Sequence, residues 1–210
     1  MKRFKILGIV GSHRIEKKNT YYLVEQVLKY AGRGEEFETE ILTLADKNLK
    51  YCSSCFKCNR EPCPIEDDMK KIYPKLLASD AIILGTPVYI YNVSARLKTL
   101  IDRSRAILFR KEENLKGKVG AGVVVGFVRN GGSEMTAQSL RNFFEVHQMF
   151  YAGTAIGNSG RDGGVTKDST GKMFAKQVGK RVRKLLIQLK DLTFEHDKKI
   201  IEKIHSKIYD

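Results

Sequence analysis

The four cysteines of the chain all lie within one short segment with the spacing C-x2-C-x2-C-x4-C, at Cys52, Cys55, Cys58 and Cys63. Packing alone would scatter small apolar residues, so this grouping needs a chemical explanation. Four thiolates on one loop can converge on a single metal centre and complete an all-sulfur shell. The pattern favours a cysteine-ligated [4Fe–4S] cluster. A structural zinc site and free or disulfide-paired thiols are the alternatives.

The spacing separates the first two of these possibilities. Structural zinc sites usually pair two CxxC units across a longer loop, because four thiolates must reach tetrahedral corners around one small ion. Three cysteines in a continuous C-x2-C-x2-C run wrap more naturally around the corners of a cubane. Pro62 and Pro64 flank Cys63 and stiffen the chain where the fourth thiol approaches.

Composition and charge indicate the cellular compartment and the kinds of binding partner to expect. Its 210 residues are enough for one domain with a proper core. The apolar run near the N-terminus is too short and too interrupted by glycine for a signal peptide or a membrane span. We therefore expect a cytoplasmic protein without membrane contact, in a reducing compartment that favours metal-bound thiolates. The net charge of +14 would suit an acidic protein, an anionic cofactor or nucleic acid.

Apolar runs alternate with helix-like patterns along the whole chain. Buried strands are expected at residues 5–10, 38–44, 80–85, 119–128 and 149–156. Helices are expected at residues 19–30, 67–79, 94–105, 133–147 and 170–190, with Asn19 or Thr20 capping the first and Ser94 the third. Asp67 and Asp68 are expected only to support a helix start. This alternation predicts an α/β fold, a three-layer sandwich around a five-stranded parallel sheet.

Ligands of such sheets bind at the carboxyl ends of the strands, where three loops are informative. The first loop, residues 11–20, reads GSHRIEKKNT and combines hydroxyls, an amide, an arginine and a helix start. Such a loop suits a phosphate monoester. It matches neither the Walker A motif nor GxGxxG. Taken alone, it could equally be a polar loop with a helix cap.

The other two loops carry aromatic rings and glycines. Residues 85–94 contain Pro87, which fixes a turn, and Tyr89 and Tyr91, on which a planar ring could stack. Residues 128–134 contain the pair Gly131-Gly132, which permits close approach of the backbone to a ligand. Together, the three loops would hold a phosphate, a ring edge and a ring face. They predict a mononucleotide with a flat head group.

At this point the residues resemble a known family. GSHRIEKKNT resembles the phosphate loop of NAD(P)H-dependent FMN reductases, TPVYIYNVSARLKTLIDRS resembles their isoalloxazine segment, and RNGGSEMTAQSLRNFFEVHQM resembles a third segment of one branch. The same branch carries a compact four-cysteine insert after strand two, followed by Asp-Asp-Met, as found here at residues 67–69. The branch is the archaeal-type iron–sulfur flavoprotein, and the resemblance covers roughly residues 3 to 190.

The resemblance implies a flavodoxin-like fold with strand order 2-1-3-4-5, FMN, a [4Fe–4S] cluster, and a homo-oligomer, either a dimer or a tetramer. It assigns the phosphate to Ser12, Arg14, Asn19 and Thr20. It assigns the isoalloxazine to Thr86, Pro87, Val88, Tyr89, Ile90, Tyr91, Asn92, Arg129, Asn130, Gly131 and Gly132. His13 stands where relatives have proline, and residues 15–18 are bulky where relatives favour glycine.

The function expected from these parts is electron transfer. A cluster passes one electron at a time and FMN holds one or two, so the pair would join a ferredoxin-like acidic carrier to a two-electron acceptor through FMN. The alternatives are an NAD(P)H-dependent FMN or quinone reductase without a cluster, and a basic module that uses a metal knuckle to bind nucleic acid. The last is disfavoured because the lysines are spread along the chain.

Two further expectations concern the rest of the chain. No catalytic acid–base pair or nucleophilic triad is apparent, and His147, His196 and His205 are expected to be surface or satisfied histidines. Residues 1–192 should form the FMN-binding domain, with the cysteine loop at residues 46–66. Residues 193–210 should form an amphipathic helical tail with an apolar stripe at Ile200, Ile201, Ile204 and Ile208.

Overall fold

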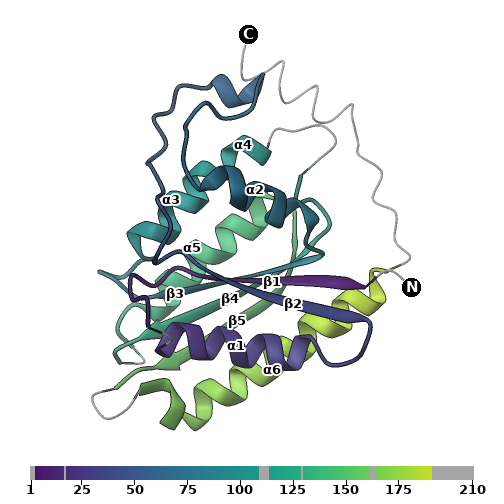
Figure 1. The fold of residues 1–210 in the computed structure, drawn as a ribbon. Coiled ribbons are helices and arrows are strands. Elements are labelled where there is room, and N and C mark those ends of the chain that lie inside the picture. Colours follow the sequence, from purple (N-terminus) through teal and green to yellow (C-terminus); the bar gives the residue numbers. More distant parts are fainter. Residues whose placement is uncertain (1–2, 17, 109–113, 129, 161–163, 191–210) are drawn as a thin grey trace.

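A five-stranded parallel sheet forms the centre of the molecule in the computed structural model, which describes residues 3–16, 18–108, 114–128, 130–160 and 164–190 (Figure 1). The spatial order of the strands is β2-β1-β3-β4-β5, as the family resemblance implied. Their bounds are β1 Phe4–Val10, β2 Phe37–Thr43, β3 Ala81–Pro87, β4 Val119–Gly126 and β5 Phe150–Asn158.

Helices cover both faces of the sheet and make it a three-layer sandwich (Figure 1). On one face lie α1 (Asn19–Ala31) and α6 (Ser169–Gln188). The other face is covered by α2 (Met69–Ala78), α3 (Ala95–Arg103), α4 (Arg105–Leu108) and α5 (Ser133–Val146). Two short 3-10 turns complete the described elements, η1 (Lys57–Asn59) and η2 (Gly164–Lys167).

The alternation of side chains along each strand explains why both faces are apolar. In β1, Ile6 and Val10 belong to the core under α1 and α6, whereas Leu7 and Ile9 belong to the core under α2 and α3. A parallel sheet buried on both faces therefore reads as a continuous apolar run. In β4, Gly120 leaves the space that the ring of Phe144 fills, so α5 can approach the sheet closely.

The observed elements match the predicted ones with small shifts and one split. The helix expected over residues 94–105 ends at Arg103, and a separate short helix, α4, begins at Arg105. Ser94 caps α3 as predicted, since its side chain accepts a hydrogen bond from Leu97 N at 3.2 Å. The tail proposed for residues 193–210 lies outside the described residues, and within them no helix is long and apolar enough to cross a membrane.

The prediction that Asn19 or Thr20 caps α1 is wrong. The capping position falls on Lys18, and no side chain makes a capping hydrogen bond there. Asn19 instead accepts a hydrogen bond from Val165 N at 3.1 Å, which ties the start of α1 to η2. Thr20 is already inside the helix and buried. The tertiary contact with η2 therefore takes the side chain that a local capping rule assigned to the helix itself.

Candidate functional site

The first two predicted loops are joined by hydrogen bonds at the carboxyl end of the sheet. Gly11 N donates to Gly85 O at 2.7 Å, and the hydroxyl of Ser94 donates to Gly11 O. A Cβ at Gly11 would lie 2.7 Å from the Cβ of Leu97, so the close contact between loop and helix requires glycine. Ser94 thus caps α3 and fixes the first loop at the same time.

A small hollow lies in the first loop, where a phosphate was expected. Its volume is about 60 Å³, which is room for a small anion, and its lining includes Ser12, Arg14, Lys18 and Thr20. Ser12 Oγ accepts a hydrogen bond from Arg14 N at 3.2 Å and shapes the turn. Glu16 also lines this hollow, beside the hydroxyls and cations. The carbonyl oxygen of the Asn19 side chain accepts a hydrogen bond from Val165 N.

The second loop presents its aromatic side chains to the surface. Tyr89 and Asn92 exchange backbone hydrogen bonds at 3.0 and 3.1 Å, and between them Ile90 and Tyr91 adopt left-handed backbone conformations with φ of 45° and 59°. Two consecutive residues in this sparsely allowed region indicate a turn that the surroundings hold in place. The turn leaves Ile90 94% exposed and Tyr91 60% exposed.

The side chains of Thr86 and Asn92 form hydrogen bonds with neighbouring protein groups. The buried hydroxyl of Thr86 accepts a hydrogen bond from Ser94 N at 3.0 Å and donates to Pro87 O at 2.8 Å. The amide oxygen of Asn92 accepts from Val93 N at 2.8 Å and from the hydroxyl of Ser139 at 3.0 Å. These two side chains shape the loop from inside, so the surfaces open to a ring are those of Tyr89, Ile90 and Tyr91.

The third loop lies against the second, as the joint prediction required. Gly132 has φ of 89°, and a Cβ there would lie 2.5 Å from Cδ1 of Tyr91. On the other side, the ring of His13 lies 5.6 Å from the ring of Tyr89, so all three loops meet around the tyrosines. Asn130 is exposed beside Gly131, and Arg129 lies outside the described residues.

The cysteine segment is a curled loop between β2 and α2. Ser54 and Phe56 have φ of 52° and 57°, and these left-handed residues turn the chain between Cys52 and Cys58. All four thiols are free; those of Cys52 and Cys55 are exposed, and those of Cys58 and Cys63 are half-buried. Within the described ranges, no three His, Cys, Asp or Glu side chains are placed to hold one ion. The donor set fits a soft metal centre, although the thiols are not gathered.

The surroundings shift the pKa values of the Cys55 and Cys58 thiols in opposite directions. The N–H of Lys57 lowers the pKa of the Cys55 thiol, since it stabilises a thiolate. Burial raises the pKa of the Cys58 thiol, and the positive charge of Arg105 opposes that effect. Cys63 lines a hollow of about 800 Å³ with Tyr73 and Lys70. None of the described residues of the three carboxyl-edge loops lines that hollow.

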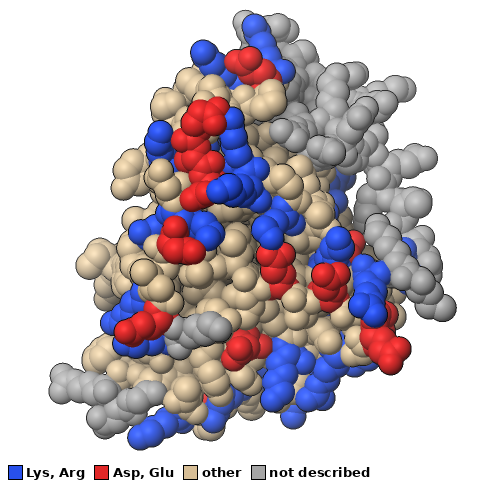
Figure 2. Space-filling view, viewed as in Figure 1, with Lys and Arg blue, Asp and Glu red and all other residues tan. Residues whose placement is uncertain are grey.

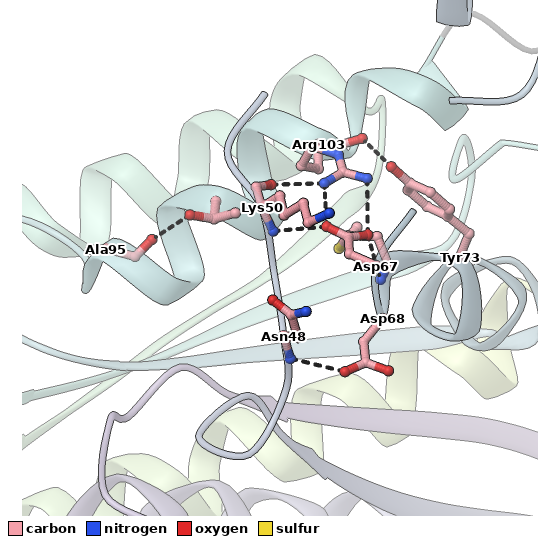
Figure 3. A network of polar contacts seen from close by, with 9 residues as sticks. Asn48, Lys50, Asp67, Asp68, Tyr73, Ala95 and Arg103 are labelled. Carbon is pink, nitrogen blue, oxygen red and sulfur yellow. Dashed lines mark hydrogen bonds and ion pairs between the residues drawn. The ribbon is translucent and has the colours of Figure 1, made fainter. Parts of the chain in front are cut away.

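A buried ion pair anchors both ends of the cysteine segment (Figure 3). Arg103, at the end of α3, contacts both carboxylate oxygens of Asp67 at 2.5 and 3.1 Å and donates to Lys50 O at 2.7 Å. Asp67 in turn accepts hydrogen bonds from Lys50 N at 2.8 Å and Met69 N at 3.0 Å. The chain before Cys52 and the chain after Cys63 are thus held by one guanidinium–carboxylate pair.

Two neighbours complete this anchor. Asp68 accepts a hydrogen bond from Asn48 N at 2.9 Å, which adds a second link between the two ends of the segment. The hydroxyl of Tyr73 donates to Arg103 O at 2.9 Å, and burial raises the pKa of Tyr73 to about 12. Asp67 supports the start of α2 as expected, through its hydrogen bond from Met69 N. Both Asp67 and Asp68 also link the two ends of the cysteine segment, which the sequence did not predict.

His147 is neither exposed nor near the candidate site. Its Nε2 lies 2.9 Å from the hydroxyl of Ser104, and burial lowers its pKa to about 4, so the ring is neutral at physiological pH. It packs against Phe143 with ring centroids 4.6 Å apart. His147 was expected to be a surface or satisfied histidine, but it is buried, and its Nδ1 has no hydrogen-bond partner among the described residues. His196 and His205 lie outside the described residues.

The fold and the three converging loops define a flavodoxin-like α/β protein that carries a four-cysteine loop after its second strand. The family model described as NADPH-dependent FMN reductase matches residues 4–164. The chain therefore belongs to the NADPH-dependent FMN reductase family.

Relatives in this family carry a narrower description. The chain is 42% identical over 197 residues to an iron–sulfur flavoprotein of Methanocaldococcus jannaschii, covering 89% of this chain and 99% of that protein. It is 36% identical over 184 residues to an iron–sulfur flavoprotein of Methanosarcina thermophila, covering 85% of this chain and 93% of that protein.

Solved structures support the fold. RosB, determined with bound 8-demethyl-8-formylriboflavin-5'-phosphate, superposes with a TM-score of 0.76 at 15% identity, covering 99% of this chain and 88% of that one. The WrbA-like flavodoxin of Agrobacterium tumefaciens superposes with a TM-score of 0.60 at 20% identity, covering 89% and 99%. At these identities the likeness concerns the fold alone, and it confirms the flavodoxin-like architecture.

The buried anchor gives the first testable prediction. Asp67→Asn should destabilise the protein by about 3–5 kcal/mol, because it leaves the guanidinium of Arg103, whose side chain is 1% exposed, without its carboxylate. Asp102→Asn is the matched control. It breaks the surface pair between Asp102 and Lys98, so it should cost about 0–1 kcal/mol in urea denaturation.

The pH dependence of the same variant has a defined sign. Burial raises the pKa of Asp67, but hydrogen bonds from Arg103, Lys50 and Met69 outweigh it and hold the pKa below its usual value. Asp67 therefore stabilises the fold above its unfolded pKa, and this contribution is lost as the pH falls through the lower folded pKa. The difference between wild type and Asp67→Asn should shrink in acid. A difference that stays constant to about pH 2 would contradict the anchor.

Proposed function

We propose that this protein is a redox flavoprotein that binds FMN at the carboxyl edge of the sheet and a [4Fe–4S] cluster on the cysteine segment. It would transfer electrons between a ferredoxin-like one-electron carrier and a two-electron acceptor through FMN. The observation that carries the proposal is the coexistence, in one chain, of three loops that meet around exposed tyrosines and a loop with four free thiols. The relatives described as iron–sulfur flavoproteins support it.

The proposed FMN contacts follow from the loop geometry. The phosphate would lie in the hollow of the first loop, against Ser12, Arg14 and Thr20, at the start of α1. Asn19 would contribute less than expected, because its carbonyl oxygen binds Val165 N. The isoalloxazine would lie against the second and third loops, with the residues from Pro87 to Asn92 and from Arg129 to Gly132 as its frame. Thr86 would act only through the loop that it shapes.

Bound together, FMN would supply one- or two-electron chemistry and the cluster one-electron chemistry. The task of the protein is to place and shield them. The turn from Tyr89 to Asn92 holds two aromatic rings at the edge of the site, and Gly132 lets the third loop close against Tyr91. Cys52, Cys55, Cys58 and Cys63 would be the cluster ligands, on a segment whose two ends Arg103 holds.

A cluster-free NAD(P)H-dependent FMN or quinone reductase is the second candidate. The observation that favours it is the state of the thiols, since the cysteine side chains are not gathered around one point in the described part of the chain. The family description is also compatible with it. The two candidates differ in iron content and in visible absorption, so one spectrum of the purified protein separates them.

The position of the cysteine segment supports a homo-oligomer. In Figure 1 this segment lies beyond α2, α3 and α4, whereas the three flavin loops lie at the carboxyl edge of the sheet. Tyr51 on the cysteine segment is 78% exposed, and Ile90 and Tyr91 are exposed on the second loop. Apolar surface at both places would be covered if the cysteine segment of one subunit approached the flavin loops of another. We propose this arrangement for a dimer or a tetramer.

The surface charge supports an acidic electron carrier as partner. Lys and Arg occur across the face shown in Figure 2, interspersed with fewer acidic residues. The residues of α6 include six Lys or Arg side chains and no Asp or Glu, at Lys172, Lys176, Lys180, Arg181, Arg183 and Lys184. A positive field of this kind accelerates the encounter with an acidic protein and weakens as salt is added.

The cluster proposal predicts the outcome of replacing one ligand. Anaerobically purified wild type should show flavin bands together with a broad visible absorption from iron and sulfur. Cys55→Ser should lose the broad absorption and the low-temperature spin-resonance signal of the reduced protein, yet keep the flavin, because the flavin loops lie elsewhere. Ser54→Gly, at the exposed neighbouring position, should keep both signals. A normal spin-resonance signal from Cys55→Ser would exclude this residue as a ligand.

The assembly proposal predicts a specific interface residue. Sedimentation should show an oligomer for wild type and smaller species for Tyr51→Glu, since a charge on the cysteine segment would have to be desolvated in the contact. Met173→Glu places the same charge on α6, away from the proposed contact, and should leave the assembly intact. A wild-type monomer with both cofactors and full electron transfer would refute the cross-subunit arrangement.

The partner proposal predicts a salt dependence. The rate of reduction by an acidic ferredoxin should fall steeply as ionic strength rises, because screening removes the attraction between opposite charges. Reduction by a small neutral donor should hardly change, which serves as the control. Equal salt dependence for the two donors would mean that the basic charge serves solubility or stability instead.

A further inference from the structure

Arg105 reaches from the start of α4 into the middle of the cysteine segment. Its guanidinium carbon lies 4.8 Å from the centroid of the Phe56 ring, and its Nη2 donates to Oδ1 of Asn59 at 3.2 Å. These two residues bracket Cys58, which lies in η1 between them. The turn η1 contacts α4, and Cys58 packs against the core cluster that includes Ala106 and Ile107. The guanidinium therefore contacts the residues on both sides of Cys58 in the sequence.

Arg103 and Arg105 have different surroundings although only Ser104 separates them. Arg103 is buried against the carboxylate of Asp67, and its side-chain contacts are with Lys50 and Asp67 at the ends of the segment. Arg105 contacts the middle of the segment, through Phe56 and Asn59 on either side of Cys58 in the sequence. The first arginine holds the ends of the loop, and the second faces a proposed ligand.

We propose that Arg105 is a positioning residue of the cysteine-ligated centre that also sets its reduction potential, by holding a positive charge beside Cys58 on the ring of Phe56 and the amide of Asn59. This inference rests on the proposed cluster. A cluster ligated by four thiolates gains negative charge when it accepts an electron, so a fixed cation nearby stabilises the reduced form. Charge and burial around a cluster are established determinants of its potential.

The test is a set of reduction potentials measured by spectroelectrochemistry on anaerobically purified protein. Arg105→Gln should make reduction of the cluster less favourable, on the order of tenfold in the equilibrium constant, or about 59 mV more negative for one electron. Arg105→Lys retains the charge and should restore most of the difference. Arg60→Gln removes the same charge from an exposed position of the same segment, and its potential should equal that of wild type. The flavin potential and the iron content of each variant are recorded alongside.

Each outcome has a defined meaning. A cluster potential that is unchanged in Arg105→Gln at full iron content would overturn the inference. Equal shifts in Arg105→Gln and Arg105→Lys would also overturn it, because the charge would then not be the cause. If Arg105→Gln fails to retain iron, retention by Arg105→Lys supports the inference and loss in both overturns it. Absence of iron from wild type as well would instead overturn the proposed function, and this inference with it.

Discussion

The ion pair between Arg103 and Asp67 is the constraint around which the cysteine half of the molecule is built. Removing two charges from water is costly, so such a pair depends on hydrogen bonds to its remaining donors and acceptors. Here the main chain of Lys50 and Met69 provides partners for both carboxylate oxygens and for one guanidinium nitrogen, whereas Nε of Arg103 has no hydrogen-bond partner among the described residues. Satisfying the pair therefore fixes where the chain leaves β2 and where it enters α2. A segment with few apolar residues of its own obtains two defined ends in this way.

The flavin half depends on a different device, the close approach of backbones at the carboxyl edge of the sheet. Gly11, Gly85 and Gly132 each occupy positions where a side chain would collide with Leu97, Val24 or Tyr91. Ser94 then joins the first loop to the start of α3 through one hydroxyl. Rigid strands and small residues thus bring three sequence-distant loops together.

The parallel sheet and the convergence of the loops could be predicted because they follow from local patterns, whereas the order of the strands came from the family resemblance. Buried parallel strands read as apolar runs, and their loops must meet at the carboxyl edge whatever the details of packing. The side-chain partners could not be predicted in the same way. Asn19 reads as a helix cap, yet it binds Val165, and Asp67 reads as a helix-start residue, yet it binds Arg103. In both cases the partner is distant in the sequence, and no local rule names it.

The flavin loops and the cysteine segment differ in how many protein contacts hold their conformation. Around the flavin loops, backbone hydrogen bonds between Tyr89 and Asn92 and the close contact of Gly132 with Tyr91 fix the base of the tyrosine turn. In the cysteine segment, the ends are anchored but the middle carries exposed thiols and the exposed residues Tyr51 and Phe56. Binding of a metal centre contributes folding free energy that such a segment lacks, since ligation replaces packing as the source of order. Anchored ends and accessible thiols suit a segment whose fold is completed by metal binding. Arg105 contributes contacts to the middle of this segment, on Phe56 and Asn59 at either side of Cys58.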